Sequence, residues 1–226
     1  MKYELTNETK WHYGHNLHRI RAIEDFADVR AGDLGGWIES ESNLAQDGNA
    51  WLYKESKAYG NACVVGNATA DGHSEISGNA VLADYATMHN DTKLYGDARA
   101  GGHSRMENDT KVCGRSRIDD CAMLSNSAIV RDNAIVAGDS VVFGHASISM
   151  NAKVEDSIVF GHASISGNAV LSSARVWGDA EVYSNAEITG SSMISGNARI
   201  YGKVENVTID SYAPKNNLIE EEEVEL

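Results

Sequence analysis

A six-residue repeat runs without a frame break through residues 49–156 of this 226-residue chain, in 18 consecutive hexads. Examples are NAVLAD at 79–84 and DTKLYG at 91–96. The second position of each hexad is small (Ala80, Thr92), the fourth is apolar (Leu82, Leu94), and the sixth is usually Gly, Asp or Asn. A fixed short period of this kind indicates a solenoid rather than a globular domain.

Strand geometry assigns a place to each hexad position. Positions two and four lie two residues apart, so both side chains point to the same side of a strand, while positions three and five point to the other. Positions six and one form a corner, where Gly, Asn and Asp tolerate a positive φ. Three strands and three corners close one coil of about 18 residues, and coils stack about 4.8 Å apart. The sequence therefore predicts an all-β, three-sided parallel solenoid with these side chains buried: Leu52, Ile76, Leu94, Val130 and Ile148.

An aliphatic residue is repeatedly followed, four places later, by a small one, as in Leu52 and Ser56 or Leu94 and Ala98. This pattern covers roughly residues 43–209 and resembles the hexapeptide-repeat, left-handed parallel β-helix family. The resemblance implies a left-handed coil and a homotrimer. A pentapeptide solenoid would need a period of five, and a calcium-binding roll would need repeated G-G-x-G-x-D, which the chain lacks.

Residues 1–48 lie outside the hexad frame, and we expect them to form an N-terminal β cap over the open end of the solenoid. Short strands are expected at 2–6 and 17–23, with a turn at 14–16. The run LHRIRAIEDFADVRAGDLGGWIESESNLAQDGNAWLY resembles the N-terminus of enterobacterial and phage β-helix proteins, some of which carry an acyltransferase label given by fold analogy. Three histidines of this segment (His12, His15 and His18) are interpreted as exposed or capping residues, and no metal site is predicted.

Beyond residue 156 the frame slips twice. The segments 157–161 and 174–178 are hexads without position one, which leaves the inward positions Val159 and Val176 in phase. The solenoid is expected to span 49–202. Residues 203–226 are expected to form a C-terminal cap and an acidic tail, either a helix or a solvated segment, that includes Glu220–Glu223.

The net charge of −14 argues against binding to nucleic acid or to a membrane surface. No apolar run is long enough for a signal peptide or a spanning helix. Three cysteines (Cys63, Cys113 and Cys121) have no pair spacing, so we interpret them as free thiols in a reducing compartment. The expected location is the cytoplasm, that of a bacterial host if a phage encodes the protein.

Stacking the hexads assigns the outward residues to faces, and the face that begins at Asn49 is called the first. Its last coils carry apolar side chains where water-facing residues would be expected, which indicates an interface. We call this set the apolar ladder: Val141, Phe143, Ile158, Phe160, Trp177 and Met193. A homotrimer contact and coverage by the C-terminal tail are the two interpretations, and both can hold.

Basic residues gather in the middle of the chain against this acidic background. Arg99 and Arg117 stack on the third face, Lys93 and Lys111 stack on the second, and Arg105 belongs to the first. Surface ion pairs with nearby carboxylates are one explanation. An anion-binding site is the other, because the guanidinium fork suits phosphate and carboxylate groups.

Acyltransferases of the hexapeptide-repeat family that this chain resembles use a histidine base and bind the acyl donor between trimer subunits. Under that interpretation His103 or His145 would be the base and acetyl-CoA or another acyl-CoA the donor. Both histidines occupy corner positions, however, and no orienting partner or inserted loop is recognisable. We therefore predict no catalytic residue and no cofactor.

The favoured prediction is a non-catalytic binding protein, phage or prophage encoded, that sequesters a nucleotide-like anionic small molecule or occludes a host protein, as in counter-defence. A hexapeptide-repeat acyltransferase is the alternative, and a structural or assembly protein is the second alternative.

Overall fold

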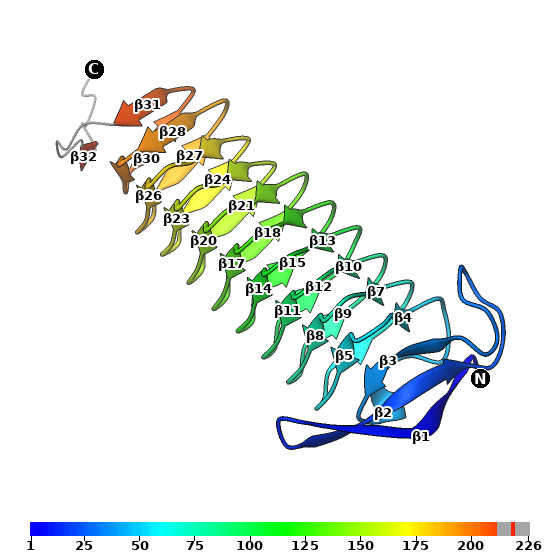
Figure 1. Ribbon diagram of the computed structural model, residues 1–226. Helices are drawn as coiled ribbons and strands as arrows, with labels where there is room; N and C mark the ends of the chain where they lie inside the picture. Colours follow the sequence, from blue (N-terminus) through cyan, green and yellow to red (C-terminus); the bar gives the residue numbers. More distant parts are fainter. Residues whose placement is uncertain (212–217, 220–226) are drawn as a thin grey trace.

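Three parallel sheets, one per face, run along the axis of the protein in the computed structural model, which describes residues 1–211 and 218–219 (Figure 1). The strands of each sheet come from successive coils, so neighbours in space are three strands apart in the chain. The expected all-β, three-sided parallel solenoid is confirmed. The one helix among the described residues is a single 3₁₀ turn, η1 (Glu41–Asn43), and no described helix could therefore cross a membrane.

The first face is a sheet of ten described strands: β4 (Trp51–Leu52), β7 (Thr69–Ala70), β10 (Thr87–Met88), β13 (Arg105–Met106), β16 (Met123–Leu124), β19 (Val141–Val142), β22 (Ile158–Val159), β25 (Arg175–Val176), β28 (Met193–Gly196) and β31 (Thr208–Ser211). The third face has nine: β6 (Cys63–Val64), β9 (Val81–Leu82), β12 (Arg99–Ala100), β15 (Arg117–Ile118), β18 (Ile135–Ala137), β21 (Lys153–Glu155), β24 (Val170–Ser172), β27 (Glu187–Thr189) and β30 (Lys203–Glu205).

The second face continues into the N-terminal hairpin. Its parallel part consists of β5 (Lys57–Ala58), β8 (Glu75–Ile76), β11 (Lys93–Leu94), β14 (Lys111–Val112), β17 (Ile129–Val130), β20 (Ser147–Ile148), β23 (Ser164–Ile165), β26 (Glu181–Val182), β29 (Arg199–Ile200) and β32 (Leu218–Ile219). Ahead of β5 lie β1 (Tyr3–His12), β2 (His15–Ala22) and β3 (Leu34–Ile38), of which β3 pairs antiparallel with β2 and parallel with β5.

The core is a column of inward side chains from positions two and four. Leu52, Ile76, Leu94, Val130 and Ile148 are all completely buried, as the hexad pattern predicts. The small polar residues at position two are also buried, and several of them bond across the corner. The hydroxyl of Thr92, for instance, donates to the carbonyl of His89 at 2.8 Å. A small residue at position two therefore fits the narrow corner and also ties the corner together.

Strand register confirms the coil length and the two frame slips. Thr87 pairs with Arg105, a separation of 18 residues, whereas Val141 pairs with Ile158, a separation of 17. Val159 and Val176 stay fully buried in the shortened coils. The missing residue is therefore taken from the corner, and the inward positions keep their phase.

The hairpin of β1 and β2 differs in detail from the expected short strands. β1 extends to His12, past a register shift between Leu5 and Thr9, and the turn lies at Tyr13 and Gly14 rather than at 14–16. Both turn residues have positive φ, 45° and 92°. A two-residue loop with positive φ at both positions matches the twist of a hairpin, so the pairing continues up to the loop.

The hairpin and the following loop cover the first coil. Trp51 occupies an outward position, yet only 1% of it is exposed, because Tyr3 and Phe26 pack edge-on against its ring. The ammonium group of Lys2 donates to the carbonyl of Ala50 at 2.8 Å, and burial lowers its pKa to about 8. The N-terminal segment thus covers the apolar surface at the end of the solenoid and also donates a hydrogen bond to a main-chain carbonyl there.

Parallel pairing continues beyond Gly202, where the hexad pattern ends, because β30 and β31 add to the third and first faces. The division of the chain at residues 48 and 202 stays a prediction. The acidic run Glu220–Glu223 and the possible tail over the apolar ladder lie outside the described residues.

Candidate functional site

The basic residues of the middle coils lie on three different faces, as the hexad frame predicts. Arg99 and Arg117 pair in register on the third face, and Lys93 and Lys111 pair on the second. Arg105 belongs to the first face. Arg99 and Arg117 line a common depression, whereas the other three basic residues belong to the other two faces, so the structure brings together these two arginines rather than all five residues.

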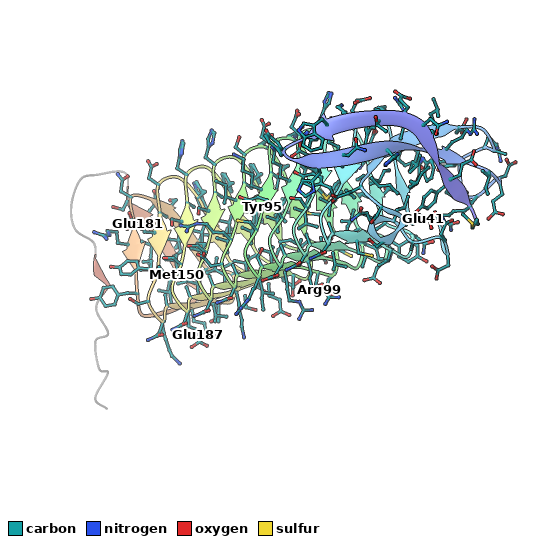
Figure 2. All side chains as sticks on the ribbon, turned by 90° about the horizontal axis from the view of Figure 1, so that it is seen from below. Glu41, Tyr95, Arg99, Met150, Glu181 and Glu187 are labelled. Atoms are coloured by element: carbon teal, nitrogen blue, oxygen red, sulfur yellow. The ribbon has the colours of Figure 1, made fainter. Side chains whose placement is uncertain are left out.

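This depression has a volume of about 400 Å³ and opens to solvent between β9, β12 and β15. The side chain of Arg99 is exposed and makes no hydrogen bond or ion pair with any of the described residues. Arg117 forms an ion pair with Asp119, with 2.8 Å between Nη2 and Oδ2. Figure 2 shows Arg99 projecting from the same side of the solenoid as Glu187, which also belongs to the third face. The guanidinium of Arg99 is therefore free to bind a ligand.

The remaining basic residues are in part accounted for by ion pairs. Nη2 of Arg105 lies 3.0 Å from Oε2 of Glu107, and Nζ of Lys93 lies 3.4 Å from Oε2 of Glu75. Lys111 makes no such contact within the described part of the chain. Surface ion pairs thus explain Arg105 and Lys93 but leave Arg99 and Lys111 without a structural role.

Acidic residues on the rim of the depression were not predicted as part of the site. Asp84 and Asp119 both line it, and Gly101 forms part of its floor. Oδ2 of Asp84 accepts a hydrogen bond from the backbone N–H of Gly102 at 3.0 Å, which fixes the carboxylate at the corner. One feature of the sequence could have indicated the depression: Gly101 occupies an outward position, and any larger side chain there would fill the space between Asp84 and Asp119.

The apolar ladder of the first face is an ordered stack. The rings of Phe143 and Phe160 lie 4.9 Å apart with 1° between their planes, and the rings of Phe160 and Trp177 lie 5.7 Å apart at 3°. Val141, Ile158 and Met193 belong to the same sheet. An open depression of about 330 Å³ lies against Ile158, Phe160, Trp177 and Met193, with Arg175 at its side.

The two histidines considered as bases are both exposed at corners. The ring of His103 stacks on that of Tyr85 at 4.8 Å, and the ring of His145 stacks on that of His162 at 5.0 Å. Neither imidazole ring makes a hydrogen bond or an ion pair to another described residue. A general base is normally oriented by a partner, so these stacks do not by themselves form a catalytic pair.

The histidines of the hairpin instead dock it onto the second face. Nε2 of His12 lies 3.3 Å from Oε1 of Glu75, and Nδ1 of His15 lies 2.9 Å from Oε2 of Glu39. Burial lowers the pKa of His12, which favours its neutral form where the end of β1 packs on the second face. Among the described residues, no three His, Cys, Asp or Glu side chains converge as metal ligands would.

No model of a known protein family matches the chain. A 51-residue segment is 51% identical to part of an uncharacterized acetyltransferase, YdcK, of Escherichia coli (strain K12). The match covers 22% of this chain and 16% of that protein, so most of each chain lies outside it.

Proposed function

We propose that the protein binds an anionic small molecule in the depression of the third face, through Arg99 and Arg117. The observation that carries this proposal is that the guanidinium of Arg99 has no hydrogen-bond or ion-pair partner among the described residues, although Arg99 lies beside a second arginine on the next coil. Like charges on neighbouring strands repel each other, and a bound anion would remove the repulsion. Each charge-assisted hydrogen bond contributes roughly 1.5–3 kcal/mol, and less at a site as open to solvent as this one.

Calorimetric titration with inorganic phosphate, ATP and acetyl-CoA tests the proposal. Replacing both arginines (Arg99→Ala with Arg117→Ala) should abolish binding without lowering the thermal unfolding midpoint. A matched control, Arg131→Ala with Arg199→Ala, removes the same charge from the second face and should leave binding intact. Unchanged affinity in the Arg99 and Arg117 variant would show that the site is elsewhere.

Acetyl transfer is the second candidate function, and the partial match to a protein named as an acetyltransferase favours it. In that case His103 or His145 would act as the base, with acetyl-CoA as donor. His103→Ala or His145→Ala should then stop acetyl-CoA turnover while donor binding persists. If the parent protein binds the anion but does not turn over acetyl-CoA, acetyl transfer is excluded and only the binding function remains.

The proposal extends to assembly. Stacked rings of the apolar ladder present a flat apolar strip on the first face, and contiguous apolar surface commonly marks an interface. We propose a homotrimer formed through this strip, as the family resemblance implies. A phage origin, a counter-defence role and a host-protein partner stay predictions from the resemblance of the cap.

A further inference from the structure

The charges around the depression of the third face balance one another. Arg99 and Arg117 supply two guanidinium groups, and Asp84 and Asp119 supply two carboxylates. A site that binds only an anion gains nothing from two carboxylates on its rim, because they repel the ligand. The arrangement instead complements a ligand that carries charges of both signs.

The carboxylates converge on one point, the space above Gly101. A Cβ atom placed on Gly101 would lie 2.9 Å from Oδ2 of Asp84 and 3.4 Å from Oδ1 of Asp119. Both oxygens therefore reach the position that a side chain would otherwise occupy. The absence of a side chain at residue 101 leaves room there for a small group such as an ammonium.

Both carboxylates are held in place by other contacts. Oδ2 of Asp84 accepts from the N–H of Gly102 at 3.0 Å, and Oδ2 of Asp119 binds Nη2 of Arg117 at 2.8 Å. Arg99 precedes Gly101 by two residues along an extended segment, a separation of roughly 6–7 Å. An anionic group on Arg99 and a cationic group over Gly101 would thus be a few bonds apart in one molecule.

We propose that the ligand of this site is a small zwitterion. Its phosphate or carboxylate binds Arg99 and Arg117, and its ammonium group lies over Gly101 between Asp84 and Asp119. This inference rests on the proposed anion-binding function and narrows the class of ligand. It favours aminoalkyl phosphates and amino acids over nucleotides, whose bases carry no positive charge at neutral pH.

A pair of probes that differ only in the ammonium group tests the inference. Titration calorimetry of the full chain should give an affinity for O-phosphoethanolamine about tenfold higher than that for ethyl phosphate. Asp84→Asn removes the negative charge but keeps an oxygen that accepts from Gly102. It should reduce this preference to less than about twofold, while the affinity for ethyl phosphate stays the same or rises.

Gly101→Ala gives a second, steric test. The methyl group would occupy the proposed ammonium position, and its nearest neighbour, Oδ2 of Asp84 at 2.9 Å, is the end of a side chain that can shift slightly to relieve the contact. This variant should keep its unfolding midpoint and lose the preference for O-phosphoethanolamine over ethyl phosphate. If Gly101→Ala does not fold, the Asp84→Asn variant alone tests the ammonium position.

Equal affinity of the parent protein for the two probes would overturn the zwitterion and leave the anion site standing. Binding of neither probe would overturn the anion site itself. Sedimentation with phosphatidylethanolamine vesicles shows whether the zwitterion is a lipid headgroup or a free small molecule. Binding to vesicles that is lost in Asp84→Asn indicates a lipid, and binding of the soluble probe alone indicates a free small molecule.

Discussion

Asp132 and Met150 occupy the same corner of successive coils, and Oδ2 of Asp132 accepts a hydrogen bond from the backbone N–H of Met150 at 3.0 Å. Both residues have positive φ, 65° and 59°. Gly114, one coil before Asp132, has φ of 74°. Asp replaces Gly in this column because its short carboxylate can bond to the next coil, which offsets the cost of the left-handed conformation.

Substitutions of Asp132 should separate these two contributions. Asp132→Val loses the hydrogen bond and places a β-branched residue at positive φ, so we expect a loss of about 2–4 kcal/mol in unfolding free energy. Asp132→Gly loses the hydrogen bond to Met150 and the exposed ion pair with Arg131. It keeps a residue suited to positive φ, and should cost about 1 kcal/mol or less. Urea unfolding followed by circular dichroism measures both. Equal stability of the two variants would contradict the assignment.

A charge placed in the core column should unfold the middle coils. Leu94 is completely buried, and no described cation is positioned to neutralise a carboxylate there. Leu94→Asp is therefore expected to cost about 4 kcal/mol or more, measured by thermal unfolding. Thr87→Asp, an outward substitution on the first face, is the control and should change the midpoint little. A Leu94→Asp variant as stable as this control would refute the inward register.

A charge in the apolar ladder should disrupt assembly and leave the fold intact. Phe160 lies between Phe143 and Trp177 in the ring stack, so Phe160→Glu places a carboxylate in the middle of the proposed interface. Sedimentation velocity should show monomers with an unchanged circular dichroism spectrum. Ser147→Glu on the second face should remain trimeric. A trimeric Phe160→Glu variant, or a monomeric parent, would exclude this interface.

Acid should loosen the hairpin before it affects the distant coils. The side-chain hydrogen bond from Lys10 lowers the pKa of Glu55, and the hydrogen bond from His15 lowers that of Glu39. Because these pKa values are lower in the folded state, both groups stabilise the hairpin above about pH 4.3, the ordinary value for glutamate. The stabilisation is lost as the pH falls through the lowered values.

Hydrogen exchange at pH 7 and pH 3 measures this effect. After correction for intrinsic exchange rates, protection of β1 and β2 should decrease more at pH 3 than protection of β17 and β20. Glu55→Gln with Glu39→Gln should make the hairpin less protected at pH 7 and less sensitive to acid. A hairpin in this variant that responds to pH as strongly as the parent would point to other titrating groups.

The solenoid could be predicted from the sequence because each hexad repeats the same local rule. Register followed directly, since residues one coil apart must pair. The 18-residue coil placed Arg99 on Arg117 correctly, and the coil shortened to 17 residues placed Phe143 beside Phe160. The hairpin was harder to predict because no repeat constrains it. Tyr13, an unusual residue at positive φ, forms half of its turn.

The acidic side of the candidate site was missed for a related reason. The hexad frame treats Asp84 as a corner residue and Gly101 as an empty outward position, and it says nothing of how side chains bend. The carboxylate of Asp84 reaches the N–H of Gly102 in the following coil, which only three-dimensional geometry reveals. Columns of outward residues can be read from the sequence, whereas contacts around a corner cannot.

The two 17-residue coils have a consequence for how such a chain can change in length. Ser157 and Ala174 follow shortened corners, yet the inward residues after them remain in phase. Removal or duplication of a complete coil preserves every inward position, and so does the loss of one corner residue. Deletion of a single inward residue instead removes a core side chain and turns the residues that follow it in the same strand to the wrong side of the wall. Genetic events of 17 or 18 codons are therefore milder for this protein than the loss of one codon within a strand.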